Sequence, residues 1–400
     1  MSDNQNAAEV ASDTRVPDRD VLIRQAVADT GLDDFGDAWM LENLAALIPI
    51  LNSEAQLTPT GVEGAKTMIH TALVNRLRHV DLVKRHPEIL EEKVDVAAVV
   101  VGLPRTGSTM LHRMLSSAPG MTGVKWWEAQ NYAPFPDETP GDPALRREAA
   151  KVYLDYFLEH APGLMSIHPM TIDQSDEELI ILGQMFSSTM IEGMYHVPSY
   201  ARWLVENSRK RCYPDLKEVL QSLQWQDKSR KSARWVLKTP GHLMALDGVL
   251  DTFPEAKIVM THRDPVSTVP SYCSMMAALY GMASTVDKVS IAQFWENRLA
   301  ELLGMFMRMR EETGDDPFVD VRYKDLVSDP IDEGKRVLAQ TGVAITPEIV
   351  AGMEEWIEAN RREDRAPHEY SMEEFALEEE QIKEKFAEYR TAYLGKDTLA

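Results

Sequence analysis

The stretch from Val96 to Leu111 constrains the fold of this 400-residue chain more than any other. It begins as an apolar run rich in β-branched residues, which reads as a buried strand ending near Gly102. A short loop then reaches Gly107, and apolar residues recur at helical spacing after it. In such a strand–loop–helix unit, backbone N–H groups and the positive end of the helix dipole converge on one point. The stretch therefore predicts a site for a phosphate-like anion.

The loop departs at one position from the P-loop of nucleoside triphosphatases. That P-loop reads G-x-x-x-x-G-K-[ST], and its lysine reaches the terminal phosphates. Here Gly102 and Gly107 have the right separation and Thr109 occupies the Ser/Thr position, but Ser108 replaces the lysine. The positive charge lies inside the loop instead, at Arg105. The loop is therefore suited to an anion other than a magnesium-bound nucleoside triphosphate.

Charge and cysteine content restrict the partners and the compartment. A formal net charge of −22 argues against nucleic acid and against an anionic membrane surface, because both are bound through basic faces. Cys212 and Cys273 have neither metal-ligand spacing nor the look of a disulfide framework, which fits a reducing compartment. No signal peptide is apparent, and the apolar residues 38–51 are too few to span a bilayer. We expect a cytoplasmic protein with no membrane span.

The chain divides at about residue 95. Residues 1–18 are polar and aperiodic, and residues 19–92 follow a helical pattern, so residues 1–95 read as a disordered tail and a helical extension. In residues 96–400 predicted strands alternate with helices, which implies an α/β fold with a parallel sheet in a P-loop-like, three-layer core. Beyond the first strand, strands are expected at residues 121–126, 234–238, 257–261 and 318–323. Helices are expected at residues 145–160, 177–194, 214–229, 242–251, 291–313 and 373–393.

Polar residues follow several of these strands. In parallel sheets, ligands bind at the carboxyl ends of the strands. The loops after the predicted strands would therefore gather at one edge of the sheet, and the side chains expected there are Arg105, Glu128, Lys238, Arg263 and Tyr323.

Two motifs carry a resemblance to a known family. Residues 104–111 resemble the 5′-phosphosulfate loop of sulfotransferases that use 3′-phosphoadenosine 5′-phosphosulfate (PAPS), which reads roughly P-[KR]-x-G-[ST]-[ST]-x-L. Residues 258–272 resemble the second motif of that family, whose arginine and serine hold the 3′-phosphate; here these are Arg263 and Ser271. Tyr323 starts a Y-K-D-L segment that is similar to one near the adenine pocket. The resemblance implies that PAPS is held by Pro104, Arg105, Thr106, Gly107, Ser108, Thr109, Met110, Arg263, Ser271 and Tyr323.

The resemblance also implies catalytic roles. Glu128, between a predicted strand and a proline-rich loop, is similar in placement to the catalytic glutamate of tyrosylprotein sulfotransferases, and we expect it to be the general base. Lys238 is similar to the lysine that contacts the bridging oxygen of the donor, and Arg105 would assist it. His168 and His242 stay open as alternative bases, because cytosolic sulfotransferases use a histidine.

Other segments have two interpretations. The methionine-rich residues 185–194 and 275–282 either line an apolar acceptor pocket or belong to the core. Residues 365–371 resemble a C-terminal loop that closes over the cofactor in bacterial relatives, although His368 and Glu369 replace stronger cations there.

These observations predict a PAPS-dependent sulfotransferase. It would move the sulfuryl group in line to a hydroxyl of a small-molecule, lipid or carbohydrate acceptor, and it would need no metal. A kinase-like P-loop phosphotransferase and a non-catalytic nucleotide-binding module remain as alternatives. The sequence does not fix the oligomeric state, and a homo-oligomer is one possibility.

Overall fold

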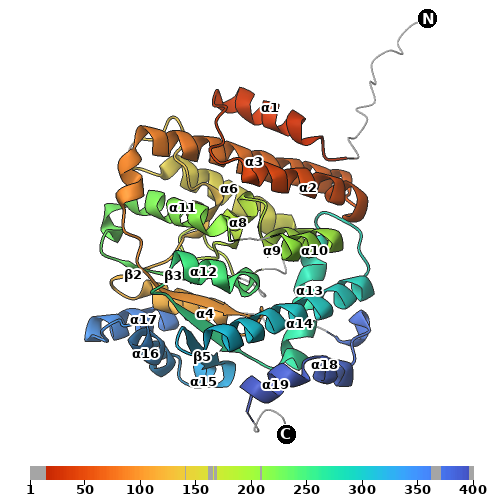
Figure 1. Ribbon diagram of the computed structural model, residues 1–400, viewed down its shortest axis with the longest axis vertical. Coiled ribbons are helices and arrows are strands. Elements are labelled where there is room, and N and C mark those ends of the chain that lie inside the picture. The colour runs from red at the N-terminus through yellow and green to blue at the C-terminus, as the bar shows by residue number, and fades with distance from the viewer. Residues whose placement is uncertain are drawn as a thin grey trace, which may run out of the picture.

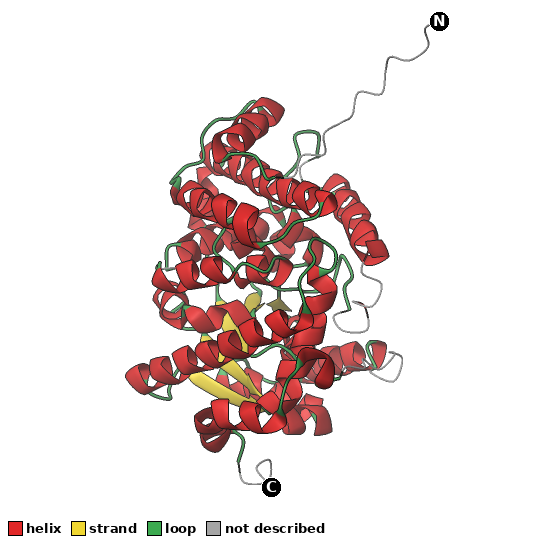
Figure 2. Cartoon of the chain, turned by 90° about the vertical axis from the view of Figure 1, so that its right-hand side faces the viewer, coloured by secondary structure: helices red, strands yellow, loops and turns green. Residues whose placement is uncertain are grey.

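The computed structural model describes residues 15–139, 141–160, 165, 169–207, 210–361 and 371–395. Its centre is a five-stranded parallel sheet in the order β2-β3-β1-β4-β5 (Figures 1 and 2). All four strand pairs are parallel. The strands are β1 (Val96–Gly102), β2 (Met121–Thr122), β3 (Arg234–Lys238), β4 (Lys257–His262) and β5 (Phe318–Arg322). The predicted α/β fold with a parallel sheet is confirmed.

The central strand is apolar along its whole length because helices cover both of its faces. Every residue of β1 is buried, as expected for a parallel strand between two helical layers. One face packs against four helices: α4 (Ser108–Ser117), α15 (Tyr323–Ser328), α16 (Pro330–Gln340) and α17 (Pro347–Ala359). The other face packs against α11 (Cys212–Gln226), α12 (Leu246–Thr252), α13 (Pro265–Tyr280) and α14 (Lys288–Thr313). The result is the predicted three-layer core.

The register brings the carboxyl ends of the strands to one edge. Val100 pairs with Lys238, and Gly102 pairs with Thr261. Gly102 has φ +138°, and a Cβ at this position would lie 2.6 Å from the carbonyl oxygen of Thr261. Only glycine allows β1 and β4 to run side by side up to the start of the loop.

The N-terminal helices pack against the rest of the chain. They are α1 (Arg19–Thr30), α2 (Trp39–Glu54), α3 (Pro59–Arg85) and the 3₁₀ helix η1 (Pro87–Glu91), at the top of Figure 1. Leu44 and Leu73 belong to the same apolar core as Val99 and Val101 of the sheet. The predicted helical N-terminal region is confirmed, while a domain boundary near residue 95 stays a prediction.

The remaining helices connect these layers. They are α5 (Trp126–Gln130), α6 (Ala144–His160), α8 (Leu179–Gln184), α9 (Thr189–Met194), α10 (Pro198–Glu206), η2 (Lys228–Arg230), η3 (Pro240–Met244), η5 (Glu373–Phe375), α18 (Glu379–Lys385) and α19 (Ala387–Tyr393). Within the described ranges, no helix combines the length and apolarity needed to cross a bilayer.

Several predicted boundaries were wrong. The single helix expected at residues 177–194 is two, α8 and α9, because Phe186 turns the chain with φ +50° and Ser188 caps α9. The second strand, expected at residues 121–126, has only two residues, since the chain turns into α5 at Trp126. The helix expected at residues 242–251 opens as η3, and the one at residues 373–393 is broken into η5, α18 and α19.

Candidate active site

The loop after β1 forms a cradle under strain. Arg105 and Gly107 have φ values of +71° and +87°, a region that residues with a side chain rarely adopt. A Cβ at Gly107 would lie 3.1 Å from the Tyr323 ring and 3.1 Å from Leu326. Gly107 is also the N-cap of α4 and has no side chain to cap it. The first N–H groups of α4 are therefore available to an anion.

Of the ten residues predicted to hold PAPS, one is buried inside the loop and nine line a cavity. Thr106 is buried, and its hydroxyl contacts the Leu103 carbonyl and the Thr261 hydroxyl, both at 2.6 Å, so its side chain stabilises the loop. The other predicted residues all line one cavity: Pro104, Arg105, Gly107, Ser108, Thr109, Met110, Arg263, Ser271 and Tyr323. The structure therefore brings nine of the ten predicted residues to one cavity, and their role in holding PAPS stays a prediction.

Two arginines meet beside this loop. Arg263 follows β4, and its Nη1 donates to the Arg105 carbonyl at 2.8 Å. Its guanidinium lies over the Tyr323 ring, 4.1 Å from the centroid. Arg105 Nε donates to the Ser271 hydroxyl at 3.2 Å. Arg105, Arg263, Ser271 and Tyr323 are therefore neighbours, and two guanidinium groups with a hydroxyl suit a phosphate.

Lys238, the last residue of β3, carries a buried ammonium group into the same cavity. Its side chain is 2% exposed, and its Nζ donates to Thr109 Oγ1 at 3.0 Å and pairs with Glu177. Its backbone N–H donates to Glu178 Oε2 at 3.1 Å. A buried cation that is held from several sides is well prepared to stabilise negative charge as it develops.

Glu177, which the sequence analysis missed, belongs to a run of three acidic residues. Each of the three pairs with a cation or a histidine from a different element: Asp176 with Arg113 at 2.8 Å, Glu177 with Lys238, and Glu178 with His242. Asp176 and Glu177 line the cavity. Acidic residues are common where a helix begins, because they complement its dipole, so such a run gives no separate signal of a site.

The partners of Glu178 are fully withdrawn from water. His242 contacts Glu178 through Nε2, and its Nδ1 lies 2.9 Å from the Tyr213 hydroxyl. Burial by itself raises the pKa of Glu178, but the hydrogen bond and the charge of His242 outweigh it and leave that pKa below its ordinary value. His242 therefore supports the strand end of Lys238 and does not line the cavity.

Glu128 lies elsewhere. It is buried, and its carboxylate oxygens lie 2.8 and 3.0 Å from Arg230 Nη2. One oxygen also accepts from the Lys125 N–H at 2.8 Å, closing the first turn of α5. Glu128 is absent from the residues that line the cavity. Its role as base stays a prediction, and the structure does not bring it together with Lys238. His168, the other alternative, and most of residues 365–371 lie outside the described residues.

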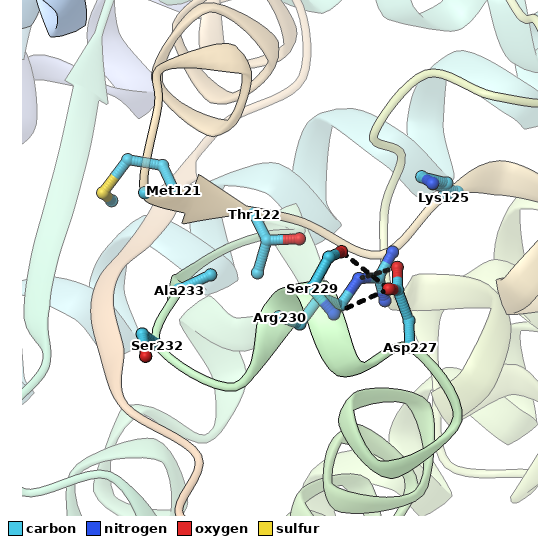
Figure 3. A pocket seen from close by; sticks show the side chains of 9 residues that line it. Met121, Thr122, Lys125, Asp227, Ser229, Arg230, Ser232 and Ala233 are labelled. Atoms are coloured by element: carbon cyan, nitrogen blue, oxygen red, sulfur yellow. Dashed lines mark hydrogen bonds and ion pairs between the residues drawn. The ribbon is translucent and has the colours of Figure 1, made fainter.

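Arg230 belongs to a second, smaller cavity of about 280 Å³. Figure 3 shows Arg230 and Asp227 directed toward one another, and Ser229 also contacts Asp227. Arg230 thus has its charge balanced by Asp227 and Glu128, both within the protein. It holds none of the predicted site residues.

The main cavity has a volume of about 860 Å³. Besides the residues predicted to hold PAPS, one part of its wall is apolar, with aromatic and methionine side chains from α5, α6, α9 and α13: Trp126, Tyr153, Phe157, Met190, Met194, Met275 and Met276. Another part is formed by Trp356 and Ile357 of α17 and by Asn360, which follows that helix; the sequence analysis singled out none of the three. Among the described residues, no three His, Cys, Asp or Glu side chains are grouped as metal ligands.

A buried histidine lies beneath the donor loop. His112 on α4 is fully buried, and its Nε2 lies 3.0 Å from the Val236 carbonyl. Burial, aided by the charge of Lys238, lowers the pKa of His112 to about 4. The helix that carries the cradle is thus sensitive to acid.

Acidification is expected to destabilise the protein through His112. The folded state keeps this ring neutral down to about pH 4, whereas the unfolded chain takes up the proton near pH 6.5. The stability that His112 contributes is therefore complete above pH 6.5 and is lost as the pH falls toward 4. Between about pH 7 and about pH 5 the loss is about 2 kcal/mol, measurable by chemical denaturation. His112→Gln, which keeps a donor for Val236, should remove that loss; an equal loss in both proteins would contradict the assignment.

The sequence and the fold both match known sulfotransferases. The model of the sulfotransferase family matches residues 98–348. The structure of sulfotransferase STF1 from Mycobacterium tuberculosis H37Rv superposes with a TM-score of 0.80 at 30% identity, covering 94% of this chain and 100% of STF1. That of STF9 from Mycobacterium avium superposes with a TM-score of 0.82 at 25% identity, covering 98% of each chain.

A curated relative matches more distantly. Omega-hydroxy-beta-dihydromenaquinone-9 sulfotransferase Stf3 from Mycobacterium tuberculosis (strain CDC 1551 / Oshkosh) is 22% identical over 255 residues, which is 62% of this chain. The chain spans 63% of the length of that relative. Because the family model covers more than half of the chain and STF1 is 30% identical over nearly all of it, this chain belongs to the sulfotransferase family of enzymes.

Proposed function

We propose that this protein transfers the sulfuryl group of PAPS to a hydroxyl of an apolar, lipid-like acceptor. The observation that carries the proposal is the ion pair of Lys238 and Glu177 in a cavity that also contains the donor loop. A cation for the leaving group and a carboxylate for the acceptor proton are the two charges that such a transfer needs.

The loop after β1 and the residues beside it would bind PAPS. The first N–H groups of α4 and Arg105 would hold the 5′-phosphosulfate, and Arg263 with Ser271 would hold the 3′-phosphate. The Tyr323 ring, which lies under the Arg263 guanidinium, would pack beside the base. The positive-φ loop has no side chain at Gly107, where a Cβ would press on Tyr323 and Leu326, and it fits a ligand that approaches the backbone closely.

Glu177 would act as the general base. Its carboxylate accepts the proton of the acceptor hydroxyl while the acceptor oxygen forms a bond to sulfur. The donor supplies the sulfuryl group, whose bond to the 5′-phosphate oxygen breaks and leaves its electron pair on that oxygen. Lys238 and the loop N–H groups stabilise the charge that develops there. Positioning and electrostatics then provide most of the rate.

The acceptor class follows from the apolar wall. Flexible methionines and aromatic rings fit alkyl or quinone-like surfaces of variable shape. The relative Stf3 is named for an omega-hydroxylated dihydromenaquinone. Both observations support a hydrophobic alcohol in preference to a sugar.

Two other functions are distinguishable from this one. A kinase-like phosphotransferase would need the P-loop lysine that Ser108 replaces and would bind ATP with magnesium. A nucleotide-binding module without catalysis would bind PAPS and transfer nothing to any hydroxyl. Incubation with PAPS and long-chain alcohols, followed by detection of the sulfated product, separates the module from the enzyme.

Calorimetry with adenosine 3′,5′-bisphosphate tests the donor site. We expect binding without magnesium, weakened about 10- to 100-fold in Arg263→Ala, because a charge-assisted phosphate contact is lost. Arg85→Ala is the matched control, since Arg85 is an exposed arginine at the end of α3, remote from the cavity lining. Preference for magnesium-ATP over the bisphosphate would overturn the proposal.

A further inference from the structure

Helix α6 carries an apolar stripe on its outward side. Val152, Tyr156, Leu145 and Tyr153 are 61%, 49%, 47% and 41% exposed, and they account for much of the large apolar side-chain exposure among the described residues. At helical spacing these four residues fall on one side of the helix, within an arc of about 100°. Exposed apolar side chains that gather in this way mark an interaction surface.

The stripe is additional to the face that α6 uses for packing. Ala150 and Leu154 are buried in a cluster with Trp126 and Met170, and Phe157 packs against it. Arg146 is buried on the packed side, paired with Glu138, and the other charged residues of α6 occupy the remaining arc, where Lys151 pairs with Asp155. The apolar arc of α6 is therefore about twice as wide as its contacts with the protein require.

The stripe continues into the cavity. Tyr153 lies on the stripe and also lines the cavity. Its ring stacks 6.1 Å from that of Trp126 and lies 6.3 Å from that of Phe157, and both of these residues line the apolar wall. An apolar path thus joins the outer surface to the part of the cavity assigned to the acceptor.

We propose that the stripe of α6 docks on a lipid bilayer and that a membrane-dissolved acceptor enters the cavity along Tyr153. The proposal rests on the proposed function for the apolar nature of the acceptor. Tyrosine rings with an apolar body and a polar tip suit the bilayer interface. The stripe itself has no charged residue, and with a net charge of −22 the protein would favour zwitterionic over anionic lipid. A second copy seated on the stripe would instead cover the edge of the cavity at Tyr153.

Co-sedimentation of the full chain with phosphatidylcholine vesicles tests the docking. Val152→Asp/Tyr156→Asp places two charges on the stripe without touching a residue that lines the cavity. The partition coefficient should fall about tenfold, because two apolar side chains no longer enter the interface. Val205→Asp/Val289→Asp, at two valines that are 38% and 39% exposed on α10 and α14, adds the same charge elsewhere and should bind like the wild type.

Turnover provides the second readout. The stripe variant should lose about tenfold in rate on a long-chain alcohol held in vesicles, yet keep the rate on a short, water-soluble alcohol. Failure of the wild type to bind vesicles, or equal binding by stripe and control variants, would overturn the docking proposal. A dimer in sedimentation velocity that the stripe variant dissociates would overturn it in favour of self-association. Bisphosphate calorimetry is independent of all these results, so it shows separately whether the proposed function fails.

Discussion

Glu177→Gln is expected to lower the rate of sulfuryl transfer by about 10²- to 10⁴-fold, the usual contribution of a general base. The substitution preserves volume and hydrogen-bonding capacity, but an amide cannot take up the acceptor proton. The affinity for adenosine 3′,5′-bisphosphate should stay equal or rise, because one negative charge leaves a cavity that binds a polyanion. Steady-state turnover with PAPS and calorimetry of the bisphosphate measure the two effects separately.

Glu128→Gln is the comparison that decides between the two candidate bases. Glu128 is paired with Arg230 in the interior, so the substitution should cost about 3 kcal/mol of stability while the turnover of the folded protein stays near that of the wild type. The opposite pattern, with turnover lost in Glu128→Gln at unchanged stability and retained in Glu177→Gln, would make Glu128 the base.

The difference between these two glutamates shows where sequence reasoning succeeds and fails. Arg105, Arg263 and Tyr323 each follow a strand, and parallel strands bring such residues to one edge without any knowledge of long-range contacts. Ser271 follows Arg263 within α13 at a fixed helical distance. The fold and the grouping of these residues at one edge of the sheet were therefore predictable from local patterns.

Glu177 was not predictable in this way. It does not follow a strand; its segment is held by an isolated bridge between Lys125 and Ser175 and by the Asp176 N–H, which donates to the Val124 carbonyl at 2.8 Å. Such contacts join residues about fifty positions apart and leave no periodic signal. The wall from α17 was missed for the same reason, since Asn360 reaches the site through a hydrogen bond with Gln174.

Glu128 was expected at the site because residues that follow parallel strands gather at one edge of the sheet. The short strand before Glu128 does not bring it there. The strand before it, β2, lies at the edge of the sheet and has only two residues. The chain then turns into α5, which directs Trp126 and Gln130 to the cavity but places Glu128 against Arg230. The carboxylate then folds back onto the Lys125 N–H. A lysine at the N-cap does not resemble the usual Ser/Thr capping sequence, and the cap therefore went unnoticed.

Lys238→Met is expected to lower turnover by about 10²- to 10³-fold, the cost of removing one donor to a developing negative charge. Methionine matches the length of the lysine stem, so the 2%-exposed site stays filled. The affinity for adenosine 3′,5′-bisphosphate should fall less, by about tenfold or below, because the product keeps the 5′-phosphate oxygen that Lys238 is proposed to contact, while Arg105 and the loop N–H groups still hold that phosphate. Lys257→Met is the control. Lys257 is the first residue of β4, so it lies at the amino-terminal end of the strands, away from the end that carries the site.

The double variant Glu177→Gln/Lys238→Met tests whether the two residues act as a unit. If deprotonation and leaving-group stabilisation belong to one transition state, the double variant should be little slower than the worse of the single variants, because each loss already disables the same step. The double variant should also be more stable than Lys238→Met, which leaves the Glu177 carboxylate without its cation at a site only 13% exposed. Multiplicative losses in rate would mean that Lys238 serves the donor independently of Glu177. Unchanged turnover in Lys238→Met would remove the ion pair from the mechanism and leave the cradle of Arg105 and α4 as the source of leaving-group stabilisation.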